Sequence, residues 1–358
     1  MFSKMSTLIT DADQALLRQD ALTAEQAARL TPAQLDLIYQ RKWFHLFVPE
    51  ALGGLEMPLP EALRLEETLA AIDGSLGWTI TLCAGAVWFA GFLDQGLATE
   101  IFSDPTACLG GSGAASGRAT REGTGYRISG QWRFATGAPH LSHFTANCQL
   151  ADEQGRLLLN EDGSPRIGAF IFRRQEVAIL PDWRAMGLVA TASHTVRVTD
   201  LWIPQQRHFI IDAAHARLPQ PVYQYPFLPF AAATLAVNYC GMALHFLTLS
   251  AALFKTKHKT LLQELHQGAT QEIETAREAF YETVIASWEA VSSGQPLSKV
   301  RCQAVNQKSA QLADVCIRKV DLLFPYCGMA GADKATEINR VWRDIHTASQ
   351  HGLLRELM

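Results

Sequence analysis

The side chains best suited to chemistry lie near the end of the chain. Arg343-Asp344 is followed, seven residues after the aspartate, by His351, and Gly352 comes next. Seven helical steps return to nearly the same azimuth, so one helix through this segment would put Asp344 and His351 on the same face. An imidazole can act as a general base near neutral pH. A histidine in the last turn before a glycine also interacts favourably with the helix dipole and then needs no catalytic role.

A second candidate segment runs from Gly125 to Gly137 and reads G-Y-R-I-S-G-Q-W-R-F-A-T-G. Its alternation predicts a strand, and Thr136 near its end offers a hydroxyl. An ordinary amphipathic strand with Trp132 and Phe134 in the core would show the same pattern. Upstream, residues 110–117 are all Gly, Ala or Ser, which predicts a loop whose backbone N–H groups can approach a ligand closely.

Composition excludes several classes of function. The net charge of −4 provides no basic field for nucleic acid or an anionic membrane. Met1–Met5 is followed by aspartates and not by an apolar stretch, so we predict no signal peptide and a cytoplasmic protein. Residues 74–93 and 222–254 lack charged side chains but contain polar and helix-disrupting residues, so we interpret both as buried core helices.

The seven cysteines are scattered and none forms a C-x-x-C pair. We therefore expect reduced, mostly buried thiols. No motif with metal-ligand spacing is present, so the sequence predicts no metal site.

The elements that must position the candidate residues fall into three regions. Helical periodicity dominates residues 1–104, where Thr31 and Pro32 form a typical helix start. Gly-rich and β-favouring segments dominate 105–212, with strands expected at 125–130, 168–172 and 195–204. Helical periodicity returns in 213–358, with long helices expected at 230–255, 258–292 and 298–324, the last supported by an Asp314–Arg318 pair. We expect pocket residues from 78–92 and 223–230.

This layout resembles the acyl-CoA dehydrogenase superfamily. Phe47 to Gly54 is similar to its V-P-E-x-x-G-G turn, and Trp183 to His194 is similar to its W-x-x-x-G-L-R-G-T-G-S-H segment, although alanines replace the last two glycines at Ala190 and Ala192. Gly125 to Gly137 follows the form found in the flavin-dependent monooxygenases of this fold, G-Y-x-x-S-G-x-W-x-F-A-S-G. The resemblance implies an α+β, mainly α fold with an N-terminal helical domain, a central β domain and a C-terminal four-helix bundle.

The resemblance also implies a flavin, FMN or FAD, supplied reduced by a separate reductase. His351 would be the catalytic base, because dehydrogenases of the family use a glutamate near this position and none stands here. Thr136 would face the flavin N5, which makes it the second catalytic residue. The remaining implied flavin contacts are Phe134, Ala135, Gly137, Ser116 and Ser193, and Gly328 and Gly331 would allow close approach in a homodimer or homotetramer.

Two alternatives stay open. One is an acyl-CoA dehydrogenase with a relocated base, and the other is a scaffold that has kept the fold without the flavin. Some monooxygenases of this type carry a second histidine in the helix before the β domain. Thr81 to Ala84 has none, and His140 or His143 could take its place. The main expectation is a monooxygenase that uses reduced flavin and dioxygen on a small organic substrate.

Overall fold

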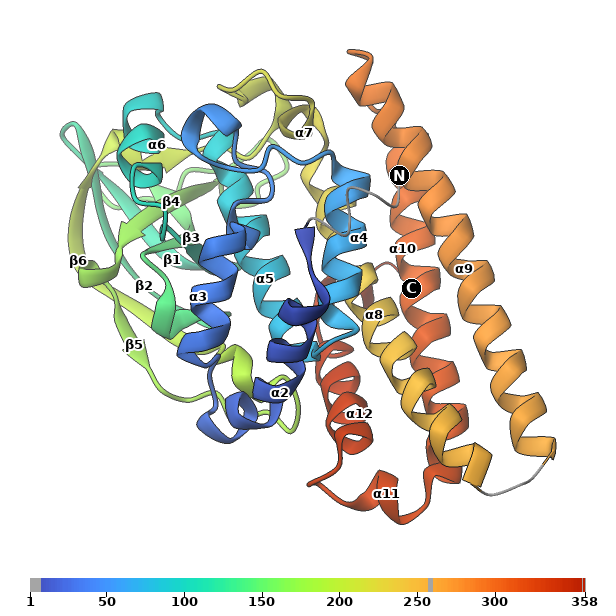
Figure 1. Ribbon diagram of the computed structural model, residues 1–358. Coiled ribbons are helices and arrows are strands. Elements are labelled where there is room, and N and C mark those ends of the chain that lie inside the picture. Colours follow the sequence, from blue (N-terminus) through green and yellow to red (C-terminus); the bar gives the residue numbers. More distant parts are fainter. Residues whose placement is uncertain (1–7, 257–259, 356, 358) are drawn as a thin grey trace.

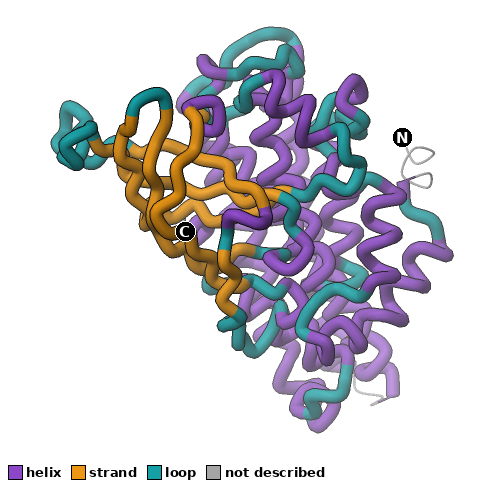
Figure 2. The backbone as a smooth tube through the Cα atoms, turned by 90° about the vertical axis from the view of Figure 1, so that its left-hand side faces the viewer, coloured by secondary structure: helices purple, strands orange, loops and turns teal. Residues whose placement is uncertain are grey.

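The computed structural model describes residues 8–256, 260–355 and 357, so the Met1–Met5 segment lies outside the described part. A sheet occupies one side of the molecule and helices occupy the other (Figures 1 and 2). Helix α5 (Gly74–Val87) contacts both the first strand of the sheet and the long helix α8 (Phe227–Thr256). The sheet, α5 and α8 therefore meet in the centre of the chain's fold.

The N-terminal helices form where their capping signals predict. They are α2 (Asp11–Ala27), α3 (Pro32–Arg41), α4 (Leu59–Ala70), α5 and α6 (Gln95–Phe102). The predicted start of α3 is confirmed, because Thr31 caps the helix through a capping box and Pro32 occupies its first turn. In the turn after Phe47, a Cβ on Gly54 would lie 2.1 Å from the Val48 carbonyl oxygen, so this turn requires glycine.

The sheet has seven strands in the order β5-β6-β2-β1-β3-β4-β7. β1 pairs with β3 in parallel, and the other neighbouring pairs are antiparallel. The predicted strands are confirmed within β2, β4 and β6. The bounds are β1 (Leu109–Glu122), β2 (Gly125–Ala135), β3 (His143–Ala151), β4 (Ile167–Arg173), β5 (Ala178–Leu180), β6 (His194–Pro204) and β7 (His208–Phe209).

The prediction of a loop at residues 110–117 was wrong, because these residues belong to β1. The strand leaves its register with β3 between Ser112 and Gly117, so a bulge interrupts the pairing there. Small residues are what the close packing of this strand demands. A Cβ on Gly111 would overlap the Thr145 carbonyl, and one on Gly117 would lie 2.2 Å from the Trp132 ring.

Helices return after the sheet, as predicted. They are α7 (Pro221–Gln224), α8, α9 (Thr260–Ser292), α10 (Lys299–Leu323), α11 (Met329–Ala332), α12 (Glu337–Ala348) and α13 (Gly352–Arg355). Helices α8, α9 and α10 pack side by side, and α12 packs on α8, which gives the expected helical bundle. The predicted Asp314–Arg318 ion pair forms on α10, with 2.7 Å between the charged groups.

Both uncharged stretches became core helices. Helix α8 is the one helix in the described part of the chain that is long and apolar enough to cross a membrane. Of its most apolar window, 78% is buried inside the protein, as in the core helix of a globular domain. Helix α5 is buried along nearly its whole length. These two helices supply the apolar wall of the site described next.

Candidate active site

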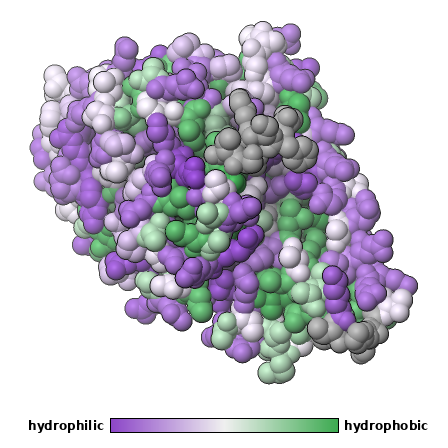
Figure 3. All heavy atoms as spheres, in the orientation of Figure 1, coloured by the Kyte–Doolittle hydropathy of each residue, from purple (hydrophilic) through white to green (hydrophobic). Residues whose placement is uncertain are grey.

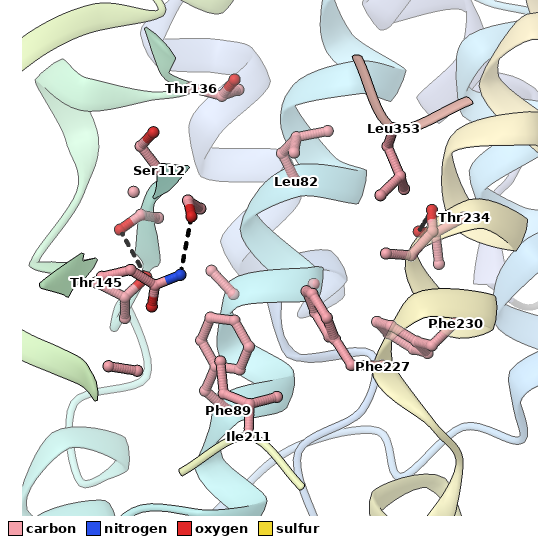
Figure 4. Close-up of a pocket in the computed structure, with 18 of the residues that line it drawn as sticks. Leu82, Phe89, Ser112, Thr136, Thr145, Ile211, Phe227, Phe230, Thr234 and Leu353 are labelled. Atoms are coloured by element: carbon pink, nitrogen blue, oxygen red, sulfur yellow. Dashed lines mark hydrogen bonds between the residues drawn. The ribbon is translucent and has the colours of Figure 1, made fainter. Parts of the chain in front are cut away.

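A cavity of about 250 Å³ lies between the sheet, α5 and α8 (Figure 4). Strands β1 and β3 form one wall with small and polar side chains, among them Ser112 and Thr145. Helix α8 forms the opposite wall with Phe227, Phe230 and Thr234. Side chains of α5 and of the turn after it, from Thr81 to Phe89, lie between the two walls. None of the cavity-lining residues in the described part of the chain is Asp, Glu, Lys or Arg.

The segments expected to supply the pocket do supply it, and the structure gives their facing. Helix α5 and the short 3-10 helix that follows it (Trp88–Gly91) contribute Leu82, Ala86 and Phe89, and α8 contributes Phe227, Phe230, Ala231, Thr234 and Leu235. These spacings of three and four residues mark one face of a helix. Because both helices are apolar all round, the sequence did not reveal which face was turned to the cavity.

Thr136 lines the cavity just beyond the end of β2. Its hydroxyl contacts the Ser193 hydroxyl at 3.0 Å, and Ser193 contacts the Thr191 hydroxyl at 2.8 Å. Thr191 in turn donates to the Leu188 carbonyl at 2.8 Å. Each hydroxyl has one proton, so Ser193 donates to Thr191 and Thr136 donates to Ser193. The Thr136 oxygen therefore keeps lone pairs for a donor in the cavity.

This hydroxyl chain is anchored to helix α12 through Leu188. The Leu188 N–H donates to Asp344 Oδ1 at 2.5 Å, and the neighbouring Gly187 N–H donates to the Thr347 hydroxyl at 2.9 Å. A Cβ on Gly187 would lie 2.1 Å from the Arg343 carbonyl oxygen, so the loop can approach α12 this closely only with glycine. Arg343 completes the contact by donating to the Met186 carbonyl at 2.6 Å.

Asp344 is fully buried, and its Oδ2 has no hydrogen-bond partner among the described residues. Burial, followed by the nearby Asp73, raises the pKa of Asp344 well above its usual value. Arg343 and Asp344 therefore bind the loop that packs behind Thr136. Neither residue lines the cavity itself.

Phe134 precedes this corner and presents its ring to the surface. The side chain is 58% exposed, and its backbone adopts a φ of 68°, which is unusual for a non-glycine residue. The ring meets Trp183 edge-on at 6.1 Å between centroids, and the Arg133 guanidinium lies 4.8 Å from the ring centre. Ala135, by contrast, is fully buried. Phe134 and Thr136 therefore flank an accessible corner, with Ala135 behind it.

The loop that lost two glycines keeps the conformation that glycine favours. Ala192 adopts a φ of 45° and Leu188 a φ of 49°, both in the left-handed region. Gly137, with a φ of 75°, donates its N–H to the Thr191 carbonyl at 2.8 Å. The alanine at 192 therefore does not open the loop, which still packs tightly behind Thr136.

His351 also lines this cavity. The prediction that it sits in a helix with Asp344 was wrong, because α12 ends at Ala348 and His351 lies in the link before α13. The Ala348 carbonyl accepts from the Tyr239 hydroxyl at 2.5 Å and from the His351 N–H at 2.9 Å. These bonds end the helix and fix the position of the His351 backbone.

The His351 ring meets Trp78 edge-on at 5.8 Å between centroids. Part of the ring is open to the cavity, but protein atoms surround the rest, and this burial lowers the pKa of His351. Its ring nitrogens make no hydrogen bond with the described residues. The imidazole is therefore neutral and free to accept a proton at neutral pH.

Of the predicted flavin contacts, Thr136 is among the residues that line the cavity, whereas Phe134, Ala135, Gly137, Ser116 and Ser193 are not. The Ser116 hydroxyl donates to the Gln131 carbonyl at 2.7 Å on the exposed part of the sheet, and Ser193 is buried behind Thr136. A Cβ on Gly331 would lie 3.2 Å from Cys327 and Phe324 of the same chain, and Gly328 precedes α11 with a φ of 64°. His140 and His143 do not reach the cavity either. Roles for these residues in flavin binding or subunit contact stay predictions.

Sequence comparison relates part of the chain to a known family. Residues 259–356 match the family described as acyl-CoA dehydrogenase, C-terminal domain. A pigment production hydroxylase from Rhodococcus sp. (strain ATCC 21145) is 26% identical, over 93% of this chain and 88% of the relative. The chain is therefore similar to the acyl-CoA dehydrogenase family over its C-terminal helices and to this hydroxylase over nearly its whole length.

Solved structures that share the fold of this chain include monooxygenases. The HsaA monooxygenase from M. tuberculosis matches with a TM-score of 0.88 at 22% identity, over 96% of this chain and 91% of the other. XiaF from Streptomyces sp., solved in complex with FADH2 and glycerol, matches with a TM-score of 0.86 at 22% identity, over 96% and 91%. The predicted fold and the predicted resemblance to flavin-dependent monooxygenases are confirmed.

The residues at the Thr136 corner fit a flavin. Phe134 offers an exposed aromatic face, and the Thr136 oxygen accepts from a ring N–H. A Cβ on Gly85 or Gly113 would meet no atom within 4 Å, so both glycines leave open space in the cavity. A flat ring can therefore lie against the small residues of β1 without displacing a side chain.

Proposed function

We propose that the protein is the oxygenase component of a two-component flavin-dependent monooxygenase that hydroxylates a small, uncharged aromatic molecule. A separate reductase supplies the reduced flavin. The observation that carries the proposal is that one aromatic-lined cavity brings together Thr136 and His351, which are 215 residues apart in the sequence. The first is a hydrogen-bond acceptor and the second is an unpartnered base.

Phe134, Ala135, Thr136 and Gly137 would hold the flavin, with Ser193 orienting the Thr136 hydroxyl from behind. When bound in its reduced form, a flavin supplies the electrons that activate dioxygen. The contribution of this chain is to position the ring and to keep water out. The Thr136 oxygen would accept a hydrogen bond from an N–H at the edge of the flavin ring, because the Thr136 hydroxyl proton is donated to Ser193.

His351 would accept a proton from the substrate hydroxyl or ring nitrogen. A neutral imidazole with a lowered pKa suits this step, because it is unprotonated at neutral pH. The dehydrogenase alternative needs a carboxylate at the cavity, and no lining residue in the described part of the chain carries one. The position of His351 therefore favours hydroxylation over removal of an acyl α-proton.

The substrate class follows from the walls. Phe89, Phe227 and Phe230 offer aromatic faces, and ring stacking favours a planar aromatic guest. Without a cation in the wall, a carboxylate on the guest would lose its hydration and gain no partner. A one- or two-ring neutral phenol or indole satisfies both conditions.

Several finer features belong to the same proposal. The three predicted domains, 1–104, 105–212 and 213–358, would act as units, and the protein would be cytoplasmic. A homodimer or homotetramer would use apolar surface on the C-terminal helices, where Met329 is 81% exposed. Figure 3 shows hydrophobic patches among the hydrophilic surface over the C-terminal helices, which supports an interface there.

The test combines the protein with FMN or FAD, a flavin reductase, NADH and oxygen, and measures hydroxylated product by mass spectrometry. Neutral phenols and indoles are compared with their carboxylated analogues. Product from the neutral compounds alone is expected. Anaerobic bleaching of bound flavin by an acyl-CoA would support the dehydrogenase alternative, and failure to bind oxidised or reduced flavin would support the scaffold alternative.

A further inference from the structure

A second cluster of reactive side chains lies behind the Thr136 corner. Cys83 on α5, Cys108 just before β1 and His140 after β2 bring two sulfur atoms and one ring nitrogen within 4.8 Å of one another. Both cysteines are fully buried, and His140 is partly buried. The proposed monooxygenase chemistry uses none of them, because they do not line the cavity.

The imidazole of His140 is held with a nitrogen directed inward. Its ring stacks on Phe44 at 5.4 Å between centroids and 12° between planes. A Cβ on Gly137 would lie 2.7 Å from His140 Nε2 and 3.2 Å from Cys83 Sγ, so the missing side chain of Gly137 makes room for both atoms. Nε2 is buried and has no hydrogen-bond partner among the described residues. A buried nitrogen without a partner calls for a ligand or a proton.

A second thiol pair in the same chain serves as a comparison. Cys240 and Cys316 are also buried and in contact, but no His, Asp or Glu in the described part of the chain joins them within ligand distance. The imidazole of His140 is therefore what distinguishes the Cys83–Cys108 pair as a candidate for metal binding.

The ligand types select the kind of ion. Two thiolates and an imidazole are soft and borderline ligands, which suit Zn²⁺ or Cu⁺ and not Mg²⁺ or Ca²⁺. Bond lengths of about 2.3 Å to sulfur and about 2.0 Å to nitrogen require ligand atoms that lie within about 4 Å of one another. The cluster is compatible with this spacing after small side-chain adjustments.

We propose that Cys83, Cys108 and His140 form a site for a single thiophilic d¹⁰ cation, bound by two sulfur atoms and one nitrogen. A bound ion would tie α5, the start of β1 and the turn after Thr136 to one point. Its role is structural, because it lies behind the cavity wall. The proposal does not depend on the monooxygenase activity, since ion binding is measured without flavin or substrate.

The test titrates the reduced full-length protein with Zn²⁺ in one series and with Cu⁺ in another, each against a chromophoric chelator. One equivalent of at least one ion is expected, together with a higher thermal midpoint of unfolding. Cys83→Ser, Cys108→Ser and His140→Ala should each lose this equivalent, while Cys240→Ser and Cys316→Ser should keep it. The two series distinguish a three-coordinate Cu⁺ site from a Zn²⁺ site that recruits a fourth ligand.

X-ray absorption of the loaded wild-type protein guards against variants that fail to fold. Two sulfurs and one nitrogen are expected around the ion. The proposal is overturned if the wild-type protein binds neither ion stoichiometrically, if Cys240→Ser loses the equivalent as Cys83→Ser does, or if the absorption shows only oxygen and nitrogen ligands.

Discussion

Two residues that line the cavity are held in opposite ways. Thr136 is the last member of a chain of hydrogen bonds that runs through Ser193 and Thr191 to Leu188 and the buried Asp344. His351 has a fixed backbone, but its ring meets the edge of Trp78 and makes no hydrogen bond with the described residues. The first arrangement fixes the direction of one proton. The second leaves a base able to gain and lose one.

This difference separates orientation from proton transfer. A group that holds a cofactor is oriented better within a hydrogen-bond network, because each added hydrogen bond removes a competing conformation. A general base accepts protons less readily within such a network, because a partner would occupy its lone pair or shift its pKa. The following predictions test the division, and they are arranged from the largest expected effect to the smallest.

Removing the imidazole should have the largest effect. His351→Ala is expected to lower the rate of product formation by about 10²- to 10⁴-fold, the usual contribution of a general base, without loss of flavin binding. Rapid-mixing kinetics and flavin titration measure the two quantities. The matched control is His346→Ala on the preceding helix α12, because the His346 ring is paired with Asp321 at 2.8 Å. Equal rates for wild type and His351→Ala would show that His351 is not the general base.

The pH profile should show the same group. Burial lowers the pKa of His351 below its usual 6.5, and no charged group among the described residues contributes to the shift. Since the base acts when neutral, kcat/KM should be level above pH 6.5 and fall about tenfold per pH unit below the lowered pKa. Cys83→Ser should keep this acidic limb, because Cys83 does not line the cavity. A limb that persists in His351→Ala would belong to another group.

Cutting the anchor of the network should cost stability. Asp344→Ala leaves the Leu188 N–H without its acceptor, and we expect the free energy of unfolding to fall by about 1–3 kcal/mol. Asp344→Asn keeps an oxygen at the same place and should lose less than half of this. Chemical denaturation measures both. If the two variants lose the same amount, the charge and not the hydrogen bond carries the contribution of Asp344.

Removing the last hydroxyl should have the smallest effect. Thr136→Val is expected to weaken binding of reduced flavin by about 0.5–1.5 kcal/mol, or about 2- to 12-fold in Kd, while Thr136→Ser stays near wild type. Anaerobic titration with reduced flavin gives the constants. A Thr136→Val protein with wild-type affinity would show that the hydroxyl does not contact the flavin.

The architecture could be predicted from the sequence because helix and strand patterns depend on neighbouring residues. Helix caps such as Thr31 and the alternation after Gly125 depend on neighbouring residues, and both segments formed as expected. Residues 110–117 were mistaken for a loop because glycine and alanine have low strand propensity. Within β1 the glycines at 111 and 117 are required by tertiary contacts, because a side chain there would overlap Thr145 or Trp132.

The site was harder to predict because its details depend on distant contacts. Sequence patterns do not show that the Tyr239 hydroxyl donates to the Ala348 carbonyl, where α12 ends before His351. The link from Leu188 to Asp344 joins residues 156 positions apart. The cluster of Cys83, Cys108 and His140 was hidden for the same reason, since no motif spacing connects them.

Helix α12 is linked to both residues, because Asp344 holds the loop behind Thr136 and the Ala348 carbonyl accepts from the His351 N–H. The two contacts lie about one helical turn apart, so a slide of α12 carries the loop behind Thr136 and the backbone of His351 in the same direction. The spacing between the orienting group and the base would then change less than the position of either against the walls formed by α5, α8 and the sheet.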